Sequence, residues 1–454
     1  MFILQEAADP LKRFLQLSGA NGAVQGILLR LVLCFIVHRG KMSCMQAAGV
    51  VASNTVHRAQ VTRCLLRGYW KKFDFNDPLR KALLKLESRK GKFIFIADAT
   101  LTSQQGKLTE NTFSVQNRKQ RSSKKKRYGK RKYPSKKCHS FTFGLLITPS
   151  GIRIPYQIPF KTVEYCKEYG LDRLTTAEAA AEMIRSLPLP PEAEVVVLGD
   201  TAYESEVVRQ ACEERGYTWI FPANSSRVFD GPKNKRPKLR SRLQSWSQLS
   251  LKKIRLQASS GKYVNQRRVS AYRLGPKLKP RVYYAHEETR DVRNVGSVRI
   301  VYSTTKEELK KATADDVKIL LTNAKGISLT EVLELYSLRW QIELFFKELK
   351  STLGFDHYSF KRFDAVLAWT EAVMTAFLYL EYERAKRIAD RTLTEEERKW
   401  WQTQRCHGLC QAVQLSLRKR ELRYLHDRLK TSGGIAKLKR MLVNALPTEY
   451  RMSA

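Results

Sequence analysis

Apolar and polar positions follow a helical period over Tyr336–Lys350, YSLRWQIELFFKELK. At about 100° per residue, one arc of about 80° holds five apolar side chains, which are Leu335, Leu338, Ile342, Phe345 and Leu349. A second arc of about 60° holds a polar set, which is Tyr336, Arg339, Glu343 and Lys350. The pattern predicts a single helix with one face packed on a core and another face equipped for chemistry.

Two continuous apolar runs end at an aspartate: KFIFIAD closes at Asp98, and EVVVLGD closes at Asp200. Runs of this length are typical of buried strands. Because ligands gather beyond the carboxyl ends of strands in α/β sheets, we expect both aspartates at one rim, with Glu343 leaning over it. A single Asp after a strand is most often a helix cap or turn residue. That role does not explain two such acids together with the Glu343 helix.

Turn and capping signals predict further elements. The segments Ser140–Ile147 and Ile152–Phe160 flank a TPSG turn and predict a hairpin. Thr175 and Glu178 form a capping box at the start of a helix. The remaining apolar segments are two strands, a helix after Asp200 and a long helix expected to pack against the sheet: Tyr217–Ala223, Val317–Asn323, Glu206–Arg215 and Ala365–Ile388.

The N-terminal region, about Glu6 to Glu87, is predicted to be helical. Within it, Met42–Arg67 can be divided into two helices joined by a turn, with Ser53 or Asn54 capping the second. A helix-turn-helix of this kind could enter a major groove, and a plain helical hairpin fits the pattern equally well. The basic residues of the second helix favour recognition of DNA.

The chain is strongly basic, with 83 Lys and Arg against 43 Asp and Glu, a formal charge of +40 and a pI near 10.0. Such a charge indicates a polyanionic partner. A membrane surface is the competing polyanion, but the most apolar stretch, Ile27–Val37, has only 11 residues and contains Arg30. It is too short to span a bilayer, so we expect no membrane partner.

The most basic segment lies between the Asp98 strand and the predicted hairpin, where residues 118–137 contain 12 Lys or Arg and no acid. Like charges at this density repel one another, so we expect a disordered or partly ordered arm. A solvated loop without a role is one interpretation. A grip on DNA phosphates, independent of sequence and weakened by salt, is the one we favour.

The spacing Tyr-x2-Arg-x3-Glu-x6-Lys of the signature helix resembles that of bacterial cut-and-paste DDE transposases of the insertion-sequence-4 type. An ordinary surface ion pair between Arg339 and Glu343 is the alternative for these two residues alone. The resemblance implies a catalytic and metal-binding set, Asp98, Asp200 and Glu343, and a DNA-binding set, Tyr336, Arg339 and Lys350.

Three carboxylates without an imidazole form a hard oxygen site, suited to Mg²⁺ or Mn²⁺. Two ions about 4 Å apart would serve an in-line phosphoryl transfer. Water would be the first nucleophile and free a 3′-hydroxyl, which would then attack the opposite strand or target DNA; the resemblance implies the first route, through a hairpin. Because the sequence contains no GxxxxGK[ST] motif, no nucleotide cofactor is expected.

The expected fold class is α/β, with a ribonuclease-H-like core interrupted by a β-rich insertion and flanked by helical N- and C-terminal regions. The insertion would lie beside the active site and contact the transposon end. The boundaries are a DNA-binding region at 1–88, core at 89–223 with the basic arm at 117–137, insertion at 224–312, core at 313–392 and a basic helical region at 393–454.

The expected partners are double-stranded DNA, at transposon ends and target, and a second copy of the chain, because both ends of an element must be cut together. Scattered cysteines favour a reducing compartment, and the resemblance implies the bacterial cytoplasm and nucleoid. Two alternatives remain open: a metal-dependent nuclease of the same fold without strand transfer, and a non-catalytic nucleic-acid-binding protein.

Overall fold

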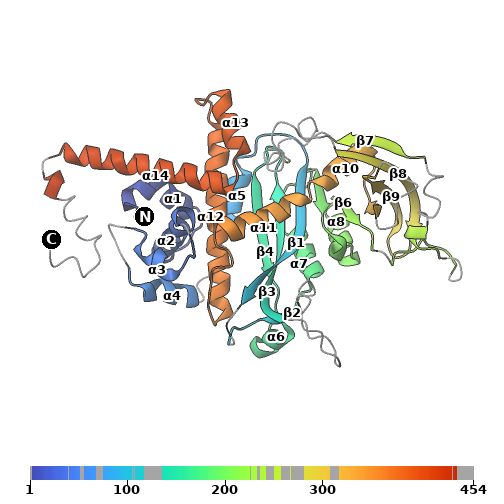
Figure 1. Cartoon of the computed structure of the whole chain (residues 1–454), viewed down its shortest axis with the longest axis horizontal. Helices are drawn as coiled ribbons and strands as arrows, with labels where there is room; N and C mark the ends of the chain where they lie inside the picture. Colours follow the sequence, from blue (N-terminus) through green and yellow to red (C-terminus); the bar gives the residue numbers. More distant parts are fainter. Residues whose placement is uncertain are drawn as a thin grey trace, which may run out of the picture.

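Most N-terminal helices and the last long helix lie at one end of the molecule, and the last strands of a long sheet form the other (Figure 1). The computed structural model describes residues 3–38, 40–51, 56–67, 75–104, 106, 108–116, 135–224, 226–232, 236–241, 250–256, 266, 281–306, 316–431 and 433–436. Residues 117–134 of the basic arm, the capping candidates Ser53 and Asn54, and the end of the C-terminal region lie outside them.

A 10-stranded mixed sheet forms the centre, with the order β2-β3-β1-β5-β6-β10-β9-β8-β7 and with β4 also paired to β3. The strands β1, β5 and β6 are parallel, and the other pairs are antiparallel. With its flanking helices, this mixed sheet is consistent with the ribonuclease-H-like fold expected from the sequence. The strands are β1 (Phe93–Gln104), β2 (Phe113–Gln116), β3 (Ser135–Ile147), β4 (Arg153–Pro159), β5 (Val195–Leu198), β6 (Thr218–Pro222), β7 (Lys252–Leu256), β8 (Arg281–Val292), β9 (Gly296–Thr304) and β10 (Lys318–Thr322).

Several local predictions are confirmed. The predicted hairpin is formed by β3 and β4, and its TPSG turn closes through a bond from Gly151 N to Thr148 O of 2.8 Å. The capping box of Thr175 and Glu178 is present at the start of a helix. Strands also lie at the two predicted apolar segments, as β6 and β10. These elements depend on neighbouring residues, so local sequence is sufficient to specify them.

Some helices pack on the sheet, and others belong to the N- and C-terminal regions. Two of them, α7 and α8, contact each other and strands β3, β4 and β6, while α11 contacts β1, and α12 contacts β4. The helices before the first strand are η1 (Gln5–Ala8), α1 (Asp9–Gln16), α2 (Gly22–Val37), α3 (Cys44–Gly49), α4 (Arg58–Leu66) and α5 (Asn76–Leu84). Those that follow it are α6 (Val163–Tyr169), α7 (Thr176–Arg185), η2 (Thr201–Tyr203), α8 (Glu206–Glu214), α10 (Leu329–Ser337), α11 (Trp340–Thr352), α12 (Phe363–Ala389), α13 (Glu395–Thr403) and α14 (Cys406–Leu429).

The N-terminal helices surround α12, which contacts α2, α4 and α5. The helical pair predicted within Met42–Arg67 corresponds to α3 and α4. The N-cap of α4 is His57, whose Nδ1 accepts a hydrogen bond from Ala59 N at 3.2 Å. The predicted cap at Ser53 or Asn54 is therefore wrong for this helix, because α4 begins later in the chain.

Helix α12 is the long apolar helix predicted from the sequence. By length and composition it is the one described helix that could cross a membrane, but 83% of its most apolar window is buried inside the protein. It packs against β4 as expected and against the N-terminal helices as well. Burial on several sides explains why a core helix of this kind is apolar around most of its circumference.

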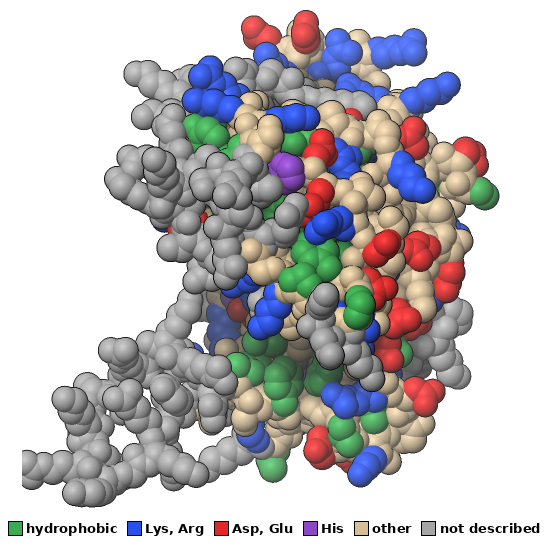
Figure 2. Space-filling view, turned by 90° about the vertical axis from the view of Figure 1, so that its right-hand side faces the viewer, with side chains coloured by type: hydrophobic (Ala, Val, Ile, Leu, Met, Phe, Trp, Pro, Cys, Tyr) green, Lys and Arg blue, Asp and Glu red, His purple; other side chains and the backbone are tan. Residues whose placement is uncertain are grey.

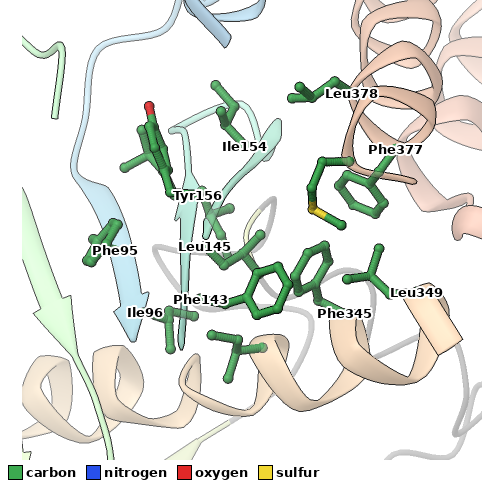
Figure 3. Packing of buried hydrophobic residues seen from close by; sticks show 14 of the residues in the cluster. Phe95, Ile96, Phe143, Leu145, Ile154, Tyr156, Phe345, Leu349, Phe377 and Leu378 are labelled. Carbon is green, nitrogen blue, oxygen red and sulfur yellow. The ribbon is translucent and has the colours of Figure 1, made fainter. Parts of the chain in front are cut away.

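The apolar stripe of the signature segment is buried as predicted, with all five side chains, Leu335, Leu338, Ile342, Phe345 and Leu349, 0% exposed. Phe345 packs edge-on against Phe143 of β3 and Phe377 of α12, with ring centroids 5.6 and 5.0 Å apart. Figure 3 shows these three rings together, with Leu349 beside them. This packing fixes α11 over the β1–β3 pair.

The prediction of one continuous helix over Tyr336–Lys350 is wrong, because the segment is divided between α10 and α11. Leu338 and Arg339 lie between them with helical φ and ψ. Around this step, four bonds join residues three apart: Leu338 N to Leu335 O, Arg339 N to Tyr336 O, Gln341 N to Leu338 O and Ile342 N to Arg339 O. The chain thus tightens locally into a 3₁₀-type turn.

A buried ion cluster joins β4, α11 and α12. Arg153 of β4 donates from Nη1 to Glu348 of α11 and from Nη2 to Glu381 of α12, at 2.8 Å in both cases. Arg384 donates to the same Glu381 carboxylate at 2.5 Å. Because charges in a protein interior need good partners, this cluster restricts how α11 can lie relative to β4.

Strands β7, β8 and β9 come from the segment 224–312 that the sequence assigned to an insertion. They continue the sheet beyond β10 through antiparallel pairs and form the end opposite the N-terminal helices (Figure 1). They are therefore edge extensions of the central sheet in the described part of the chain.

Candidate active site

The predicted end of the first strand at Asp98 is wrong, since β1 runs on to Gln104. The parallel pairing with β5 stops at Ile96, opposite Leu198, whereas the antiparallel pairing with β3 continues to Gln104. Asp98 therefore lies beyond the last residue of β1 that pairs with β5, in a part of β1 that still pairs with β3. The apolar run in the sequence ends where the edge of β1 is no longer paired with β5.

The parallel register brings the two aspartates to one rim, as expected. Ile96 is opposite Leu198, and each is followed two positions later by an aspartate. Side chains two apart in extended chain point to the same side, and Asp200 is extended, with φ of −90° and ψ of −173°. Asp200 also caps η2, accepting from Ala202 N at 2.8 Å, so the ordinary capping role and a place at the rim coexist.

Arg339 lies among the acids, at the step between α10 and α11. Its Nη2 donates to Oε1 of Glu343 at 2.6 Å, and its Nη1 is 3.6 Å from Oδ2 of Asp98. The Arg339 side chain is 18% exposed, so this pair of contacts is partly shielded from water. The surface ion pair considered as an alternative is thus part of a three-residue cluster.

The pKa of Asp98 is raised to about 6, first by burial and then by the negative charges of Asp200 and Glu343. A hydrogen bond from Ala99 N at 2.8 Å and the charge of Arg339 act in the opposite direction. Asp98 is therefore in electrostatic contact with both other predicted acids. A strongly perturbed carboxyl beside other acids is typical of a functional site.

Tyr203 is a buried residue close to the acids Asp98 and Asp200. Tyr203 is 2% exposed, its hydroxyl has no hydrogen-bond partner among the described residues, and burial with the charges of Asp98 and Asp200 raises its pKa. Its ring packs on Gly199, where an added Cβ would lie 2.9 Å from the Tyr203 Cβ. A buried unpaired donor beside acids indicates a place for a further ligand.

The donor set fits a divalent cation by its chemistry, because carboxylate oxygens that repel one another suit Mg²⁺ or Mn²⁺. Within the described ranges, however, no group of three or more His, Cys, Asp or Glu side chains is arranged to hold a metal ion. Arg339 is inserted between Asp98 and Glu343 instead. The acids could converge on a cation only after the guanidinium moves away.

Lys350 lies apart from the acids, farther along β1. Its Nζ donates to Thr100 Oγ1 at 2.7 Å and to Leu101 O at 2.8 Å, and burial lowers its pKa. Tyr336 lies on the other side, with its pKa raised to about 12 by burial. Within the polar face, Arg339 contacts Glu343 directly and also forms a side-chain hydrogen bond with Tyr336, so these three residues are grouped and Lys350 lies apart from them.

A cavity of about 330 Å³ opens beside Arg339 and is also lined by Tyr336, Trp340 and Lys318. Lys318 lies 5.0 Å from the centre of the Tyr336 ring, and burial lowers its pKa. Sequence reasoning missed both Lys318 and Tyr203. Their positions offered a signal, because Lys318 begins the strand before the signature helix and Tyr203 follows Asp200 by three residues.

A mixed sheet with two acids at one rim and a helix carrying a third acid is consistent with the ribonuclease-H-like fold of DDE transposases. Residues 172–379 match the model of the transposase DDE domain. This match supports a DDE transposase, a class that acts on DNA and generally uses divalent metal ions. The matched residues contain Asp200 and Glu343 and begin after Asp98. Among curated proteins, none matches the chain.

Proposed function

We propose that this chain is a DNA transposase of the insertion-sequence-4 type, which cuts DNA at the ends of its element and transfers the freed ends by a DDE mechanism. The observation that carries the proposal is the geometry of the rim: Asp98 and Asp200 follow the last paired residues of β1 and β5, and Arg339 contacts both Asp98 and Glu343. These acids come from two strand ends and a later helix, and a set of three acids facing DNA has no purpose in a purely electrostatic binder.

The proposed ligands of the ions are Asp98, Asp200 and Glu343. Two bound Mg²⁺ or Mn²⁺ ions would activate the attacking oxygen and stabilise the leaving oxygen of the transfer. Arg339 would then exchange its carboxylate partners for phosphate oxygens, which a guanidinium can bind bidentately. Tyr336 and Lys350 would hold neighbouring phosphates, and a phosphate beside Lys350 would oppose the lowering of its pKa that burial causes.

The chain organisation proposed from the sequence follows the same function. The helices of residues 1–88 would recognise the element end, and residues 393–454 would hold DNA or a second copy. The β-rich segment 224–312 would contact the end beside the active site, since β8 and β9 contribute Arg281 and Thr304 to the cavity that Arg339 lines. A homodimer would cut both ends together, in the bacterial cytoplasm at the nucleoid.

The test is cleavage of a labelled plasmid that carries the element with its native flanking DNA. Reactions contain Mg²⁺, Mn²⁺ or EDTA, and Asp98→Ala, Asp200→Ala and Glu343→Ala are assayed in parallel. Metal-dependent cuts at the element ends, lost in all three variants, would support the function and its site. Binding without any cutting by the wild type would instead identify a non-catalytic nucleic-acid-binding protein.

The same assay separates transposition from simple cleavage. A transposase gives products in which element ends are joined to the opposite strand or to target DNA, whereas a nuclease of the same fold gives only free ends. Hairpin ends, detected on denaturing gels, would support the route through opposite-strand attack. Free 3′-hydroxyl ends that never join would favour the nuclease.

A further inference from the structure

A cavity of about 860 Å³ lies beyond Lys350, outside the acidic cluster. It is lined by the connection between α2 and α3, by the end of β1 with the residues that follow it, and by the end of α11 with the loop that leads to α12. The fold therefore joins three segments, far apart in the sequence, around one hollow. The proposed function leaves this hollow without a role.

The cavity wall combines apolar side chains, such as Leu108 and Phe360, with polar and basic ones. Its donors are the hydroxyls of Ser103 and Ser359, the amide of Gln104, and the ammonium groups of Lys41 and Lys361. Asp356 is the single acid among the described lining residues. Hydroxyl, amide and ammonium groups of this kind can bind the phosphates and sugars of a nucleic-acid backbone.

A fixed floor supports these donors. Tyr358 OH lies 2.5 Å from Thr102 Oγ1 and 2.9 Å from Nδ1 of His139, while His139 Nε2 lies 2.9 Å from a backbone carbonyl oxygen. Because a carbonyl can only accept, His139 carries its proton on Nε2 and accepts at Nδ1 from Tyr358. Each of these hydrogen bonds therefore has a defined donor and acceptor, which restricts the orientations of the Tyr358 and His139 side chains.

The position of the cavity relates it to the acids and to the N-terminal helices. Gln104 is six residues beyond Asp98 on the same strand, a separation of about 20 Å, or about six base pairs of duplex at 3.4 Å each. On its other side, Met42 N donates to Nδ1 of His357 at 3.2 Å. That bond links the cavity loop to the start of α3, the first helix of the predicted DNA-recognising pair.

Acidic side chains gather elsewhere. Figure 2, which looks at the β7–β9 end, shows many of the visible acids on one side of the molecule and a group of Lys and Arg side chains at the top. Helices α7 and α8 carry five exposed acids, which are Glu178, Glu182, Glu206, Glu213 and Glu214. None of these five acids lines the cavity.

We propose that this cavity is a phosphate-binding groove for the duplex at the element end, about six base pairs from the phosphate that is cut. The proposal rests on the proposed function for the identity of the DNA. Lys41 and Lys361 each contact a backbone phosphate, and the serine hydroxyls contact its neighbours. The groove connects the acids to α3 and α4, so a single straight duplex reaches both.

The test is the affinity of the full chain for two duplexes, measured by fluorescence anisotropy in EDTA. Each carries about 20 base pairs of flanking DNA, and the element side is either about 20 or about four base pairs long, beyond or short of the groove. The Lys41→Gln/Lys361→Gln variant should bind the long duplex roughly tenfold more weakly, with the salt slope reduced by about two. It should bind the short duplex as the wild type does.

A matched control removes the same charge from exposed lysines near the opposite end of β1, in Lys90→Gln/Lys399→Gln, and should reproduce wild-type affinity for both duplexes. Wild-type affinity of the Lys41→Gln/Lys361→Gln variant for the long duplex would overturn the proposal, as would an equal loss on both duplexes. Because binding is measured without metal, this outcome is independent of whether the acids cut DNA.

Discussion

Nη2 of Arg339 lies 2.6 Å from Oε1 of Glu343, one helical turn away, while Nη1 of the same guanidinium is 3.6 Å from Asp98. Two of the three proposed metal ligands are therefore neutralised by a residue that is itself proposed to bind DNA. A cation and the guanidinium compete for the same carboxylates. A phosphate that attracts Arg339 would thus favour metal binding, so DNA and metal should bind cooperatively.

We expect Arg339→Gln to bind Mn²⁺ more tightly than the wild type in the absence of DNA. Releasing the carboxylates from a partly buried ion pair should change the affinity roughly fivefold, which corresponds to about 1 kcal/mol. Titration followed by electron paramagnetic resonance measures this directly. Cleavage should still be lost, because the phosphate contact is gone. Weaker Mn²⁺ binding by the variant would show that Arg339 supports the acids instead of blocking them.

The pH dependence of the free energy of unfolding should reflect the titration of the Asp98 carboxyl group. Its pKa is raised from the ordinary 3.8 to about 6, so between these values the folded protein binds more protons than the unfolded chain, and stability falls as pH rises. Asp98→Asn should therefore stabilise the metal-free protein at pH 8, by at most about 3 kcal/mol. At pH 4 the difference should vanish. Thermal unfolding with EDTA at both pH values measures it, and an equal gain at pH 4 would contradict the assignment.

Tyr203→Phe should leave the free energy of unfolding unchanged, because the hydroxyl that it removes has no partner among the described residues. Its cleavage rate should nevertheless fall, roughly tenfold, if the hydroxyl orients an acid once the site is assembled. Tyr358→Phe is the matched control. Its hydroxyl bonds to Thr102 and His139, so the control should lose about 1 kcal/mol of stability. Denaturant unfolding distinguishes the two, and a comparable loss in Tyr203→Phe would reveal a structural bond.

Breaking the buried ion cluster should unfold or loosen the core. Arg153→Met leaves the carboxylates of Glu348 and Glu381 with fewer partners, and Glu381 is 0% exposed. The expected loss is about 3–5 kcal/mol, measured by urea unfolding at pH 7. As a control, Arg185→Met removes one side of an exposed pair with Glu214 and should cost less than about 1 kcal/mol. Similar costs for the two variants would mean that Arg153 contributes little.

Much of this architecture could be predicted from the sequence because it depends on neighbouring residues. The hairpin of β3 and β4, the capping box at Thr175 and the buried stripe of the signature segment all follow from local patterns. Asp98 and Asp200 were placed at one rim from the apolar runs that precede them. The parallel register of β1 and β5 gives that inference its geometric basis.

The errors arise where tertiary contacts decide the outcome. The continuation of β1 past Asp98 depends on β3, which pairs with it as far as Gln104. The tight turn at Leu338 and Arg339 could not be predicted, because the helical period of apolar residues continues through it. Tyr203 became a candidate only when the structure showed its hydroxyl buried without a partner. The pattern of apolar and polar residues along the chain does not show which strands pair or which side chains meet in space.

The parallel register of Ile96 with Leu198 and the packing of Phe345 on Phe143 also set an order of events during synthesis. The amino-terminal segments leave the ribosome first, and long-range parallel pairs form slowly. The third acid, Glu343, takes its place only when α11 docks on the completed strand pairs. The N-terminal helices α2, α4 and α5 pack on α12, which follows α11 in the chain. The N-terminal helical region and the set of three acids are therefore both completed late, after most of the chain has been synthesised.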